Sequence, residues 1–470
     1  MSEIIQRLLL KKSLLNFESI EARTVLKRTL SAWDLTAIGI GSIIGVGIFV
    51  LPGVEAAKHA GPGIILSFVL AAVACAFTAL CYAEMTAMIP VSGSAYTYGY
   101  VALGEVFAWI IGWDLLLEYM FTISLVAVGW SSYCTDLLES LGVAIPYQWR
   151  SSPFAPTPGY CDAPALIIVA LVTSVIITGI KESARLNNLM VLIKLTAITL
   201  FVILTARHIN PVNWKPFMPF GFSGVMTAAS IVFIAYIGFD AVSTAAEEAK
   251  NPQSTLPKGI LFSLCIATIL YILVAAIMTG TVRYQILGVP DPMALVLKTL
   301  KMPTVGAFIC LAAIAGMTSV IISMMIAQPR IIFAMARDGL LPTPLAKIHP
   351  RFNTPYLATL LTGAVAAIMA SMLPIQALAE LTSIGTLFAF VIVCGGVMIL
   401  RRTNPETPRP FRVPFAPFVT TAGVISCGAL MASLPFTTWI RFAVWLLLGA
   451  LIYAFYGFRN SILNGEIKNR

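Results

Sequence analysis

The chain has 470 residues, of which 59% are hydrophobic and only 11% are charged, and its mean hydropathy is +0.90. Because soluble domains carry about 25% charged residues, this composition excludes a soluble globular protein. The net charge is +9. Its basic residues fall in predicted loops and at helix ends, where anionic membrane lipid is the expected partner. The charge therefore does not imply a nucleic-acid partner.

Apolar segments that could cross a bilayer recur along the whole chain, since a span takes roughly 20 apolar residues. Hydropathy and loop signals predict an all-α membrane protein with 12 transmembrane helices in one membrane domain. The predicted helices begin near Trp33, Gly63, Gly104, Cys161, Arg185, Phe222, Pro257, Pro303, Pro355, Ala377, Pro414 and Ile440.

The N-terminal residues 1–32 lack the uninterrupted apolar core and the cleavage site of a signal peptide. They are predicted to form a cytoplasmic tail, either an amphipathic stretch on the lipid headgroups or a solvated segment. With this end inside, 21 basic residues fall on the cytoplasmic side and eight fall outside. The positive-inside rule therefore predicts a multi-pass protein of the cytoplasmic (inner) membrane with both termini in the cytoplasm.

Two predicted helices are interrupted in a similar way, helix 1 at residues 39–47 and helix 6 at residues 235–240. They lie five helices apart, and because five is odd, two such units in series have opposite membrane orientations, as in many secondary transporters. The predicted units are a first five-helix repeat at 33–206, an inverted repeat at 222–400, helices 11 and 12 at 414–458 as an accessory or oligomerisation pair, and a cytoplasmic tail at 459–470.

The interruption in helix 1 contains four glycines within nine residues, each costing about 1 kcal/mol against alanine in a helix. An unwound stretch can bind a zwitterion, because free amides hold a carboxylate and free carbonyls hold an ammonium group. The alternative is close helix packing, since Gly41 and Gly45 also form a G-x-x-x-G pair. The matching interruption in helix 6 favours the binding site.

Three ionisable side chains fall inside predicted helices, Glu118 in helix 3, Lys194 in helix 5 and Asp240 at the helix 6 interruption. Each costs about 2.5–3.5 kcal/mol at a helix centre, so each is a functional candidate. A lysine removed from water can exchange its proton near neutral pH, which makes Lys194 the predicted proton carrier. The alternative is a structural lysine that pairs with Glu118 or with an exposed carbonyl.

Glu118 and Asp240 have a similar alternative role, as partners in a network that holds the helices together. Three further acids are expected nearer helix ends or between helices, with structural roles: Glu84, Asp114 and Glu380.

The sequence gives no signal for a metal site, a cofactor or an enzyme. The histidines fall in predicted loops, and the eight cysteines are scattered without paired spacing. Intramembrane aspartyl proteolysis would need two facing aspartates, which Asp114 and Asp240 formally supply, but it leaves Lys194 and the glycine break without a role. Cys134 and Cys161 flank a predicted outer loop and are expected as free thiols, with a disulfide as the alternative.

Five long segments occur in an order that resembles the amino acid/polyamine/organocation (APC) superfamily of permeases, within it the bacterial members of the cationic amino acid transporter family. They are GIGSIIGVGIFVLPG in helix 1, PVSGSAYTYGY after helix 2, IAYIGFDAVSTAAEEAKNPQSTLPKGI across helix 6, RIIFAMARDGLLP after helix 8 and SIGTLFAF in helix 10. The resemblance runs from about Leu30 to Phe458 and implies the LeuT-type fold, with substrate held by the two broken helices.

The resemblance also implies roles for individual residues. The substrate carboxylate would bind the amides of Gly45, Val46 and Gly47, and its ammonium group would bind the carbonyls of Ile43, Ile234, Ala235 and Ile237. The side-chain end of the pocket would be lined by Glu118, Asp240 and Met324. Lys194 matches the helix 5 lysine of proton-coupled members. Val46 is a departure, since related permeases often have a hydroxyl residue between the two glycines.

These observations predict a secondary active permease for cationic and/or small neutral L-amino acids that works by alternating access, with H+ as the coupling ion. An amino acid exchanger of the same fold is the first alternative. An amino acid sensor without turnover is the alternative of a different class. The sequence carries no signal for a particular oligomeric state or for a small membrane accessory subunit.

Overall fold

The computed structural model describes residues 30–89, 94–178, 183–244, 246, 249–350, 352 and 354–462. Over these ranges the chain is helical and contains no β-strand, which confirms the all-α prediction. The predicted tails lie largely outside the described residues. The helices are α3 (Ala32–Ile43), α4 (Val46–Phe49), α5 (Leu51–Glu55), α6 (Ile64–Met88), α7 (Ser94–Ala102), α8 (Glu105–Ser140), α9 (Ala163–Thr178), α10 (Ser183–Thr205), α11 (Gly221–Val232), α12 (Ala241–Thr244), α13 (Pro252–Thr281), α14 (Pro292–Thr299), α15 (Pro303–Arg337), α16 (Tyr356–Met372), α17 (Ile375–Thr403), α18 (Ala416–Ala432), α19 (Phe436–Ile452) and α20 (Phe458–Asn460).

Seven helical stretches of the described chain are long and apolar enough to cross a membrane. They are Leu51–Met88, Glu105–Ser140, Leu189–His208, Pro252–Thr281, Pro303–Arg337, Ile375–Thr403 and Phe436–Asn460. Four shorter apolar helices are Ala163–Ile177, Gly221–Tyr236, Tyr356–Met372 and Ala416–Ala432. The chain has the helices of a multi-span membrane protein, and the exact number of spans stays a prediction.

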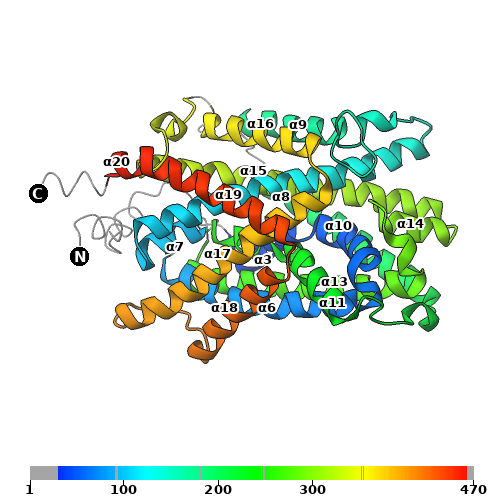
Figure 1. Ribbon diagram of the computed structural model, residues 1–470, viewed down its shortest axis with the longest axis horizontal. Coiled ribbons are helices and arrows are strands. Elements are labelled where there is room, and N and C mark those ends of the chain that lie inside the picture. The colour runs from blue at the N-terminus through cyan, green and yellow to red at the C-terminus, as the bar shows by residue number, and fades with distance from the viewer. Residues whose placement is uncertain are drawn as a thin grey trace, which may run out of the picture.

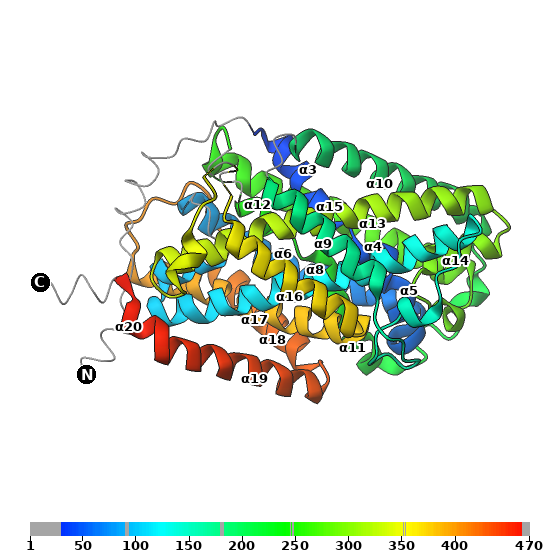
Figure 2. The ribbon, with the colours of Figure 1, turned by 90° about the horizontal axis from the view of Figure 1, so that it is seen from above.

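The long helices run broadly along the long axis of the molecule, with α20 toward one end and α14 at the other (Figures 1 and 2). Helix α8 lies among them and packs against α15, α16 and α17. Its most apolar stretch is 94% buried, as expected for a helix that is apolar all round and surrounded by others.

Most helices begin within three residues of the predicted positions, and two begin earlier. α13 begins at Pro252 rather than Pro257, which lies inside the helix. Proline is favoured at the first helical position, which explains the start at Pro252, and the helix continues past Pro257 although it loses a hydrogen bond there. α19 begins at Phe436 rather than Ile440, directly after Pro435, because α18 ends at Ala432 and the connection is short.

Helix α19 is fixed to α8 by tryptophans. The rings of Trp113 and Trp445 stack with their centroids 4.6 Å apart. Each indole also donates to the other residue's carbonyl, over 2.8 and 3.1 Å, and Trp109 donates to the carbonyl of Gly449 over 3.0 Å. One face of α19 is thus anchored to the helix at the centre of the molecule, although the sequence analysis placed helix 12 outside both predicted repeats.

Candidate functional site

The first helix is broken where the sequence analysis expected it. α3 ends at Ile43, Ile44 adopts an extended conformation, and α4 begins after Gly45. A helix leaves its first N–H groups without intrahelical partners, so the amides of Gly45, Val46 and Gly47 are donors at the start of a new helix. The break therefore provides a positive dipole end that can hold a carboxylate.

A second break lies directly against the first. α11 continues as a 3-10 turn at Phe233–Tyr236, which ends at the extended residue Ile237. A Cβ atom on Gly47 would lie 2.5 Å from the Cβ of Ala235, and one on Gly238 would lie 2.8 Å from the carbonyl carbon of Ser42. Gly238 also has a φ of +113°, which favours glycine. The glycines therefore allow the two backbones to touch.

Tyr271 of α13 joins the two breaks. Its hydroxyl lies 2.9 Å from the carbonyl oxygen of Ile43 and 2.6 Å from that of Ala235. A phenol has one hydrogen to donate, so it satisfies one of these carbonyls at a time and leaves the other available to a ligand. The sequence analysis missed this residue. A buried tyrosine hydroxyl needs a partner, but that signal does not say which carbonyl it will meet.

Lys194 is fully buried and contacts the first break. Its Nζ donates to the carbonyl oxygens of Gly41 at 2.7 Å and Ile44 at 2.8 Å, and it lies 3.2 Å from Oγ of Ser319. Of the two structural partners considered from sequence, the exposed carbonyls are the ones it meets, and it forms no ion pair with Glu118. The Lys194 ammonium group is therefore bound by backbone carbonyls at the unwound segment. Among the described residues it is the only charged group at this break.

The other predicted side chains are less closely joined to the breaks. Asp240 is buried and accepts from the Tyr119 hydroxyl at 2.5 Å and from the amide of Gly238 at 3.1 Å. Glu118 precedes Tyr119 in α8, is buried, and has no hydrogen-bond partner on either carboxylate oxygen among the described residues. Met324 is fully buried in α15. Asp240 is thus tied to the second break, and Glu118 is not hydrogen-bonded to either.

Asp114 of α8 lies against α17, since a Cβ atom on Gly385 would be 3.1 Å from its Oδ1. It is fully buried, and neither of its carboxylate oxygens has a hydrogen-bond partner in the described part of the chain. It lies four residues before Glu118, a spacing that puts both on one face of α8. Asp114 and Glu118 are therefore two buried carboxyl groups of α8 without a hydrogen-bond partner in the described part of the chain, and the structural role of Asp114 stays a prediction.

Glu380 has the interhelical role that the sequence analysis gave it. Its carboxylate accepts from Thr438 at 2.7 Å and from Gln376 at 3.2 Å, and it lies 3.6 Å from a guanidinium nitrogen of Arg441. The residue therefore links α17 to α19.

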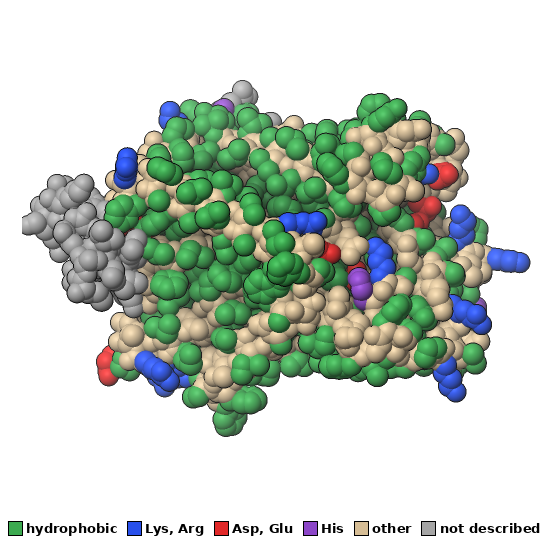
Figure 3. All heavy atoms as spheres, in the orientation of Figure 1, with side chains coloured by type: hydrophobic (Ala, Val, Ile, Leu, Met, Phe, Trp, Pro, Cys, Tyr) green, Lys and Arg blue, Asp and Glu red, His purple; other side chains and the backbone are tan. Residues whose placement is uncertain are grey.

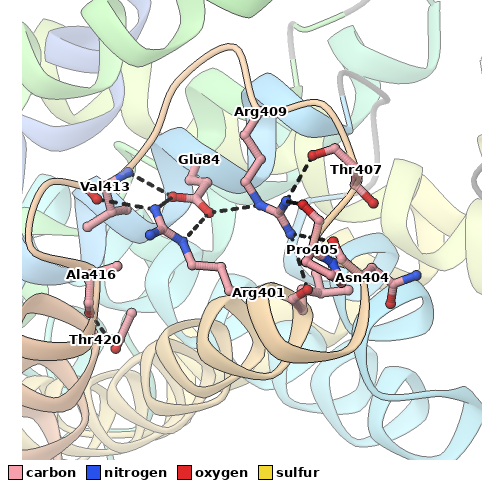
Figure 4. Close-up of polar contacts among 10 residues, drawn as sticks. Glu84, Arg401, Asn404, Pro405, Thr407, Arg409, Val413, Ala416 and Thr420 are labelled. Carbon is pink, nitrogen blue, oxygen red and sulfur yellow. Dashed lines mark hydrogen bonds and ion pairs between the residues drawn. The ribbon is translucent and has the colours of Figure 1, made fainter.

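Glu84 also has a structural role, at the ends of α6 and α17 (Figure 4). Its carboxylate accepts two hydrogen bonds from Arg401, one of them at 2.9 Å, and one from the amide of Val413 at 2.7 Å. Nε of Arg409 lies 3.4 Å away. Arg409 also donates to four backbone carbonyls, those of Leu400, Asn404, Pro405 and Thr407. One carboxylate thus holds the connection between α17 and α18 in place.

Replacing Glu84 with glutamine is expected to destabilise the fold. The change leaves two guanidinium groups around a neutral amide, and removing one partner of a buried pair costs about 3–5 kcal/mol. The unfolding midpoint of the purified protein in detergent should fall by several degrees. The control is Glu406→Gln, an exposed acid in the same connection, which should leave the midpoint in place. An equal midpoint for both variants would contradict the structural role of Glu84.

No resident metal site is indicated in the part of the chain that the structure describes, where no group of three His, Cys, Asp or Glu side chains is placed to hold an ion. Cys134 and Cys161 are both free thiols, as the sequence analysis expected.

Comparison with known proteins adds independent information. The sequence matches the amino acid permease family over residues 30–452, in agreement with the resemblance drawn from its motifs. It is 48% identical to the branched-chain amino acid permease BcaP of Bacillus subtilis, over 93% of this chain and 95% of that protein. It is 46% identical to the methylthioribose transporter of Bacillus subtilis, over 97% and 98%. Its identity to cationic amino acid transporter 4 of Mus musculus is 35%, over 83% and 62%. The chain therefore belongs to the amino acid permease family and is a membrane transporter rather than an enzyme.

Proposed function

We propose that the chain takes up cationic and/or small neutral L-amino acids together with protons by alternating access. The observation that carries this proposal is the position of Lys194, whose ammonium group binds the carbonyls of Gly41 and Ile44 at the first break. A titratable group there is coupled to the backbone that would bind substrate. Proton binding and substrate binding can then influence each other through one short segment.

The proposed architecture is the LeuT-type arrangement of 12 spans, with inverted repeats at 33–206 and 222–400 and helices 11 and 12 at 414–458. Seven long apolar helices, four shorter ones and the broken first helix support it. The two adjoining breaks are the kind of feature that marks the substrate site of such transporters. Both termini are proposed to lie in the cytoplasm, since the basic residues favour that side.

In this proposal the carboxylate of the amino acid binds the amides of Gly45, Val46 and Gly47. Its ammonium group binds the nearby carbonyls, those of Ile43, Ile234, Ala235 and Ile237. Glu118, Asp240 and Met324 line the pocket for the side chain. Because Glu118 is buried without a hydrogen-bond partner in the described chain, a cationic side chain would give it one.

The names of the relatives suggest several cargoes, among them branched-chain amino acids and methylthioribose. The breaks favour an amino acid, because they offer donors for a carboxylate next to acceptors for an ammonium group. A sugar thioether carries neither charge. One proton moving inward through 100 mV gains about 2.3 kcal/mol, which supports roughly fortyfold accumulation at 1.4 kcal/mol per decade.

The test is uptake of labelled alanine, leucine and arginine into proteoliposomes, each with and without an inside-alkaline pH gradient. We expect gradient-dependent uptake of at least one amino acid, with unlabelled methylthioribose failing to compete. Uptake only into vesicles preloaded with amino acid would instead establish an exchanger. Binding with no uptake under either condition would establish a sensor.

A further inference from the structure

A cavity of about 1000 Å³ opens beside α14, the helix at one end of the molecule (Figure 2). It lies between the last turns of α8, the segment that leads into α14, and the first turns of α15. Binding pockets for small molecules measure about 300–1,000 Å³, so the space suits a ligand the size of an amino acid. Charged side chains gather at this end of an otherwise mostly hydrophobic face (Figure 3).

The cavity wall carries charges of both signs. Its titratable side chains are Asp136 and Glu139 of α8, Asp291 before α14, Lys298 of α14, Lys301 before α15 and Cys310 of α15. Glu139 is already paired with Arg150, at 3.3 Å. Two carboxylates and two ammonium groups without an ion pair in the described chain therefore face one space.

This mixture of charges selects the chemistry of the ligand. The two lysine ammonium groups would repel a metal ion, and the described residues include no group of three side chains placed to bind one. A phosphate or another simple anion would be repelled by Asp136 and Asp291. A zwitterion meets both requirements, since its ammonium group can pair with the carboxylates and its carboxylate with Lys298 and Lys301.

Neighbours of the cavity-lining residues contact the half-helix that follows the first break. Pro292, which begins α14, packs so closely on α5 that a Cβ atom at Gly53 would lie 2.3 Å from it. Tyr133 lies three residues before Asp136 on α8 and donates to the carbonyl of Phe49 in α4 over 2.7 Å. A ligand in the cavity would therefore press on elements that hold α4 and α5.

We propose that this cavity is a second binding site for a free amino acid, separate from the helix breaks. Asp136 and Asp291 bind its ammonium group, and Lys298 and Lys301 bind its carboxylate. The proposal rests on the proposed function only in the choice of an amino acid as ligand. Occupancy here would bias the position of the half-helix, which makes the cavity a place where external amino acid can regulate transport.

The charge of Asp291 should make this site sensitive to pH. Burial, and secondly the neighbouring charge of Asp136, raises the pKa of the Asp291 carboxyl to about 6. The other groups that face it are Glu139 and Tyr133 of α8, Lys298, Lys301 and Cys310. As the pH falls through 6, Asp291 becomes neutral and the ammonium group loses a partner, so affinity should fall several-fold between pH 7.5 and pH 5.

The experiment is equilibrium binding of labelled alanine and of labelled arginine to the purified full-length protein in lipid nanodiscs. We compare the wild type with Gly45→Val, which fills the break, with the double variant Asp136→Asn/Asp291→Asn, and with Gly45→Val combined with that double change. Glu406→Gln serves as a surface-charge control, and the unfolding midpoint of each variant checks its folding.

The expected result is two molecules bound per wild-type chain and one in Gly45→Val, with that remaining site at least tenfold weaker in the triple variant and several-fold weaker at pH 5. No binding in folded Gly45→Val, or residual binding that the aspartate changes leave unaltered, would overturn the proposal, whereas a single site in the wild type that the aspartate changes weaken would contradict substrate binding at the breaks. Because the remaining site is measured in Gly45→Val, it is detected whether or not the breaks bind substrate, so its failure is distinct from a failure of the proposed transport function.

Discussion

Replacing Lys194 with alanine is expected to abolish proton-driven amino acid uptake while substrate binding persists. The ammonium group is buried and bound to the carbonyls of Gly41 and Ile44, so its removal takes away the only charged contact to the first break among the described residues. The measurement is accumulation of labelled alanine or arginine in proteoliposomes with an inside-alkaline gradient. We expect it to fall from the roughly fortyfold that 100 mV can support to equilibration alone.

Two comparisons make this result specific. Binding of the same substrate to Lys194→Ala in nanodiscs should stay within a few-fold of the wild type, because the groups proposed to contact the substrate do not include the Lys194 side chain. Lys347→Ala, an exposed lysine outside the membrane spans, should keep full gradient-driven uptake. Unchanged uptake by Lys194→Ala would remove this residue from the coupling mechanism and leave it as a structural donor.

Replacing Gly45 with valine is expected to eliminate substrate binding at the break. A Cβ atom at this position would already lie 2.9 Å from a methyl group of Val320, so the branched side chain of valine would displace the backbone where the amides of α4 begin. We expect the affinity of the break for the labelled amino acid to fall at least a hundredfold. The measurement is binding in nanodiscs at pH 7.5, after the binding retained by the cavity beside α14 has been subtracted.

The matched control for this change is Gly395→Val in α17, because a Cβ atom there meets nothing within 4 Å. Both variants add the same side chain to a helical membrane protein, and only one adds it at a break. Normal affinity in Gly45→Val would mean that the glycines serve helix packing rather than ligand binding. A loss of affinity in both variants would point to a general effect of valine.

The breaks themselves could be predicted from sequence because their cause is local. Several glycines close together make a helix unfavourable wherever they occur, and the structure ends α3 at Ile43 within that segment. The helix starts were predictable for the same reason, since prolines and apolar runs favour or disfavour helix at residues adjacent in the chain. The two starts that differ, at Pro252 and Phe436, lie where more than one local signal was available.

The partners of buried polar groups could not be predicted in this way. Tyr271 contacts carbonyls that lie 228 and 36 residues away in the chain, and the Nζ of Lys194 contacts carbonyls about 150 residues away. No sequence pattern specifies such pairs. Nor could the sequence show that the carboxylate of Asp114 has no hydrogen-bond partner in the described structure. Only the packing of helices decides which polar groups meet.

The bridge made by Tyr271 has a consequence for the part of the cycle in which no substrate is bound. A symporter must reorient once with its site empty, and two backbone segments with free carbonyls would then face each other without a donor. The single hydrogen of the Tyr271 hydroxyl can pass between Ile43 and Ala235, so the empty carrier keeps one of the bonds that an ammonium group would otherwise supply. In the symport cycle proposed above, the tyrosine hydroxyl would take the place of the substrate ammonium group during the unloaded return step, the step that distinguishes a symporter from an obligatory exchanger.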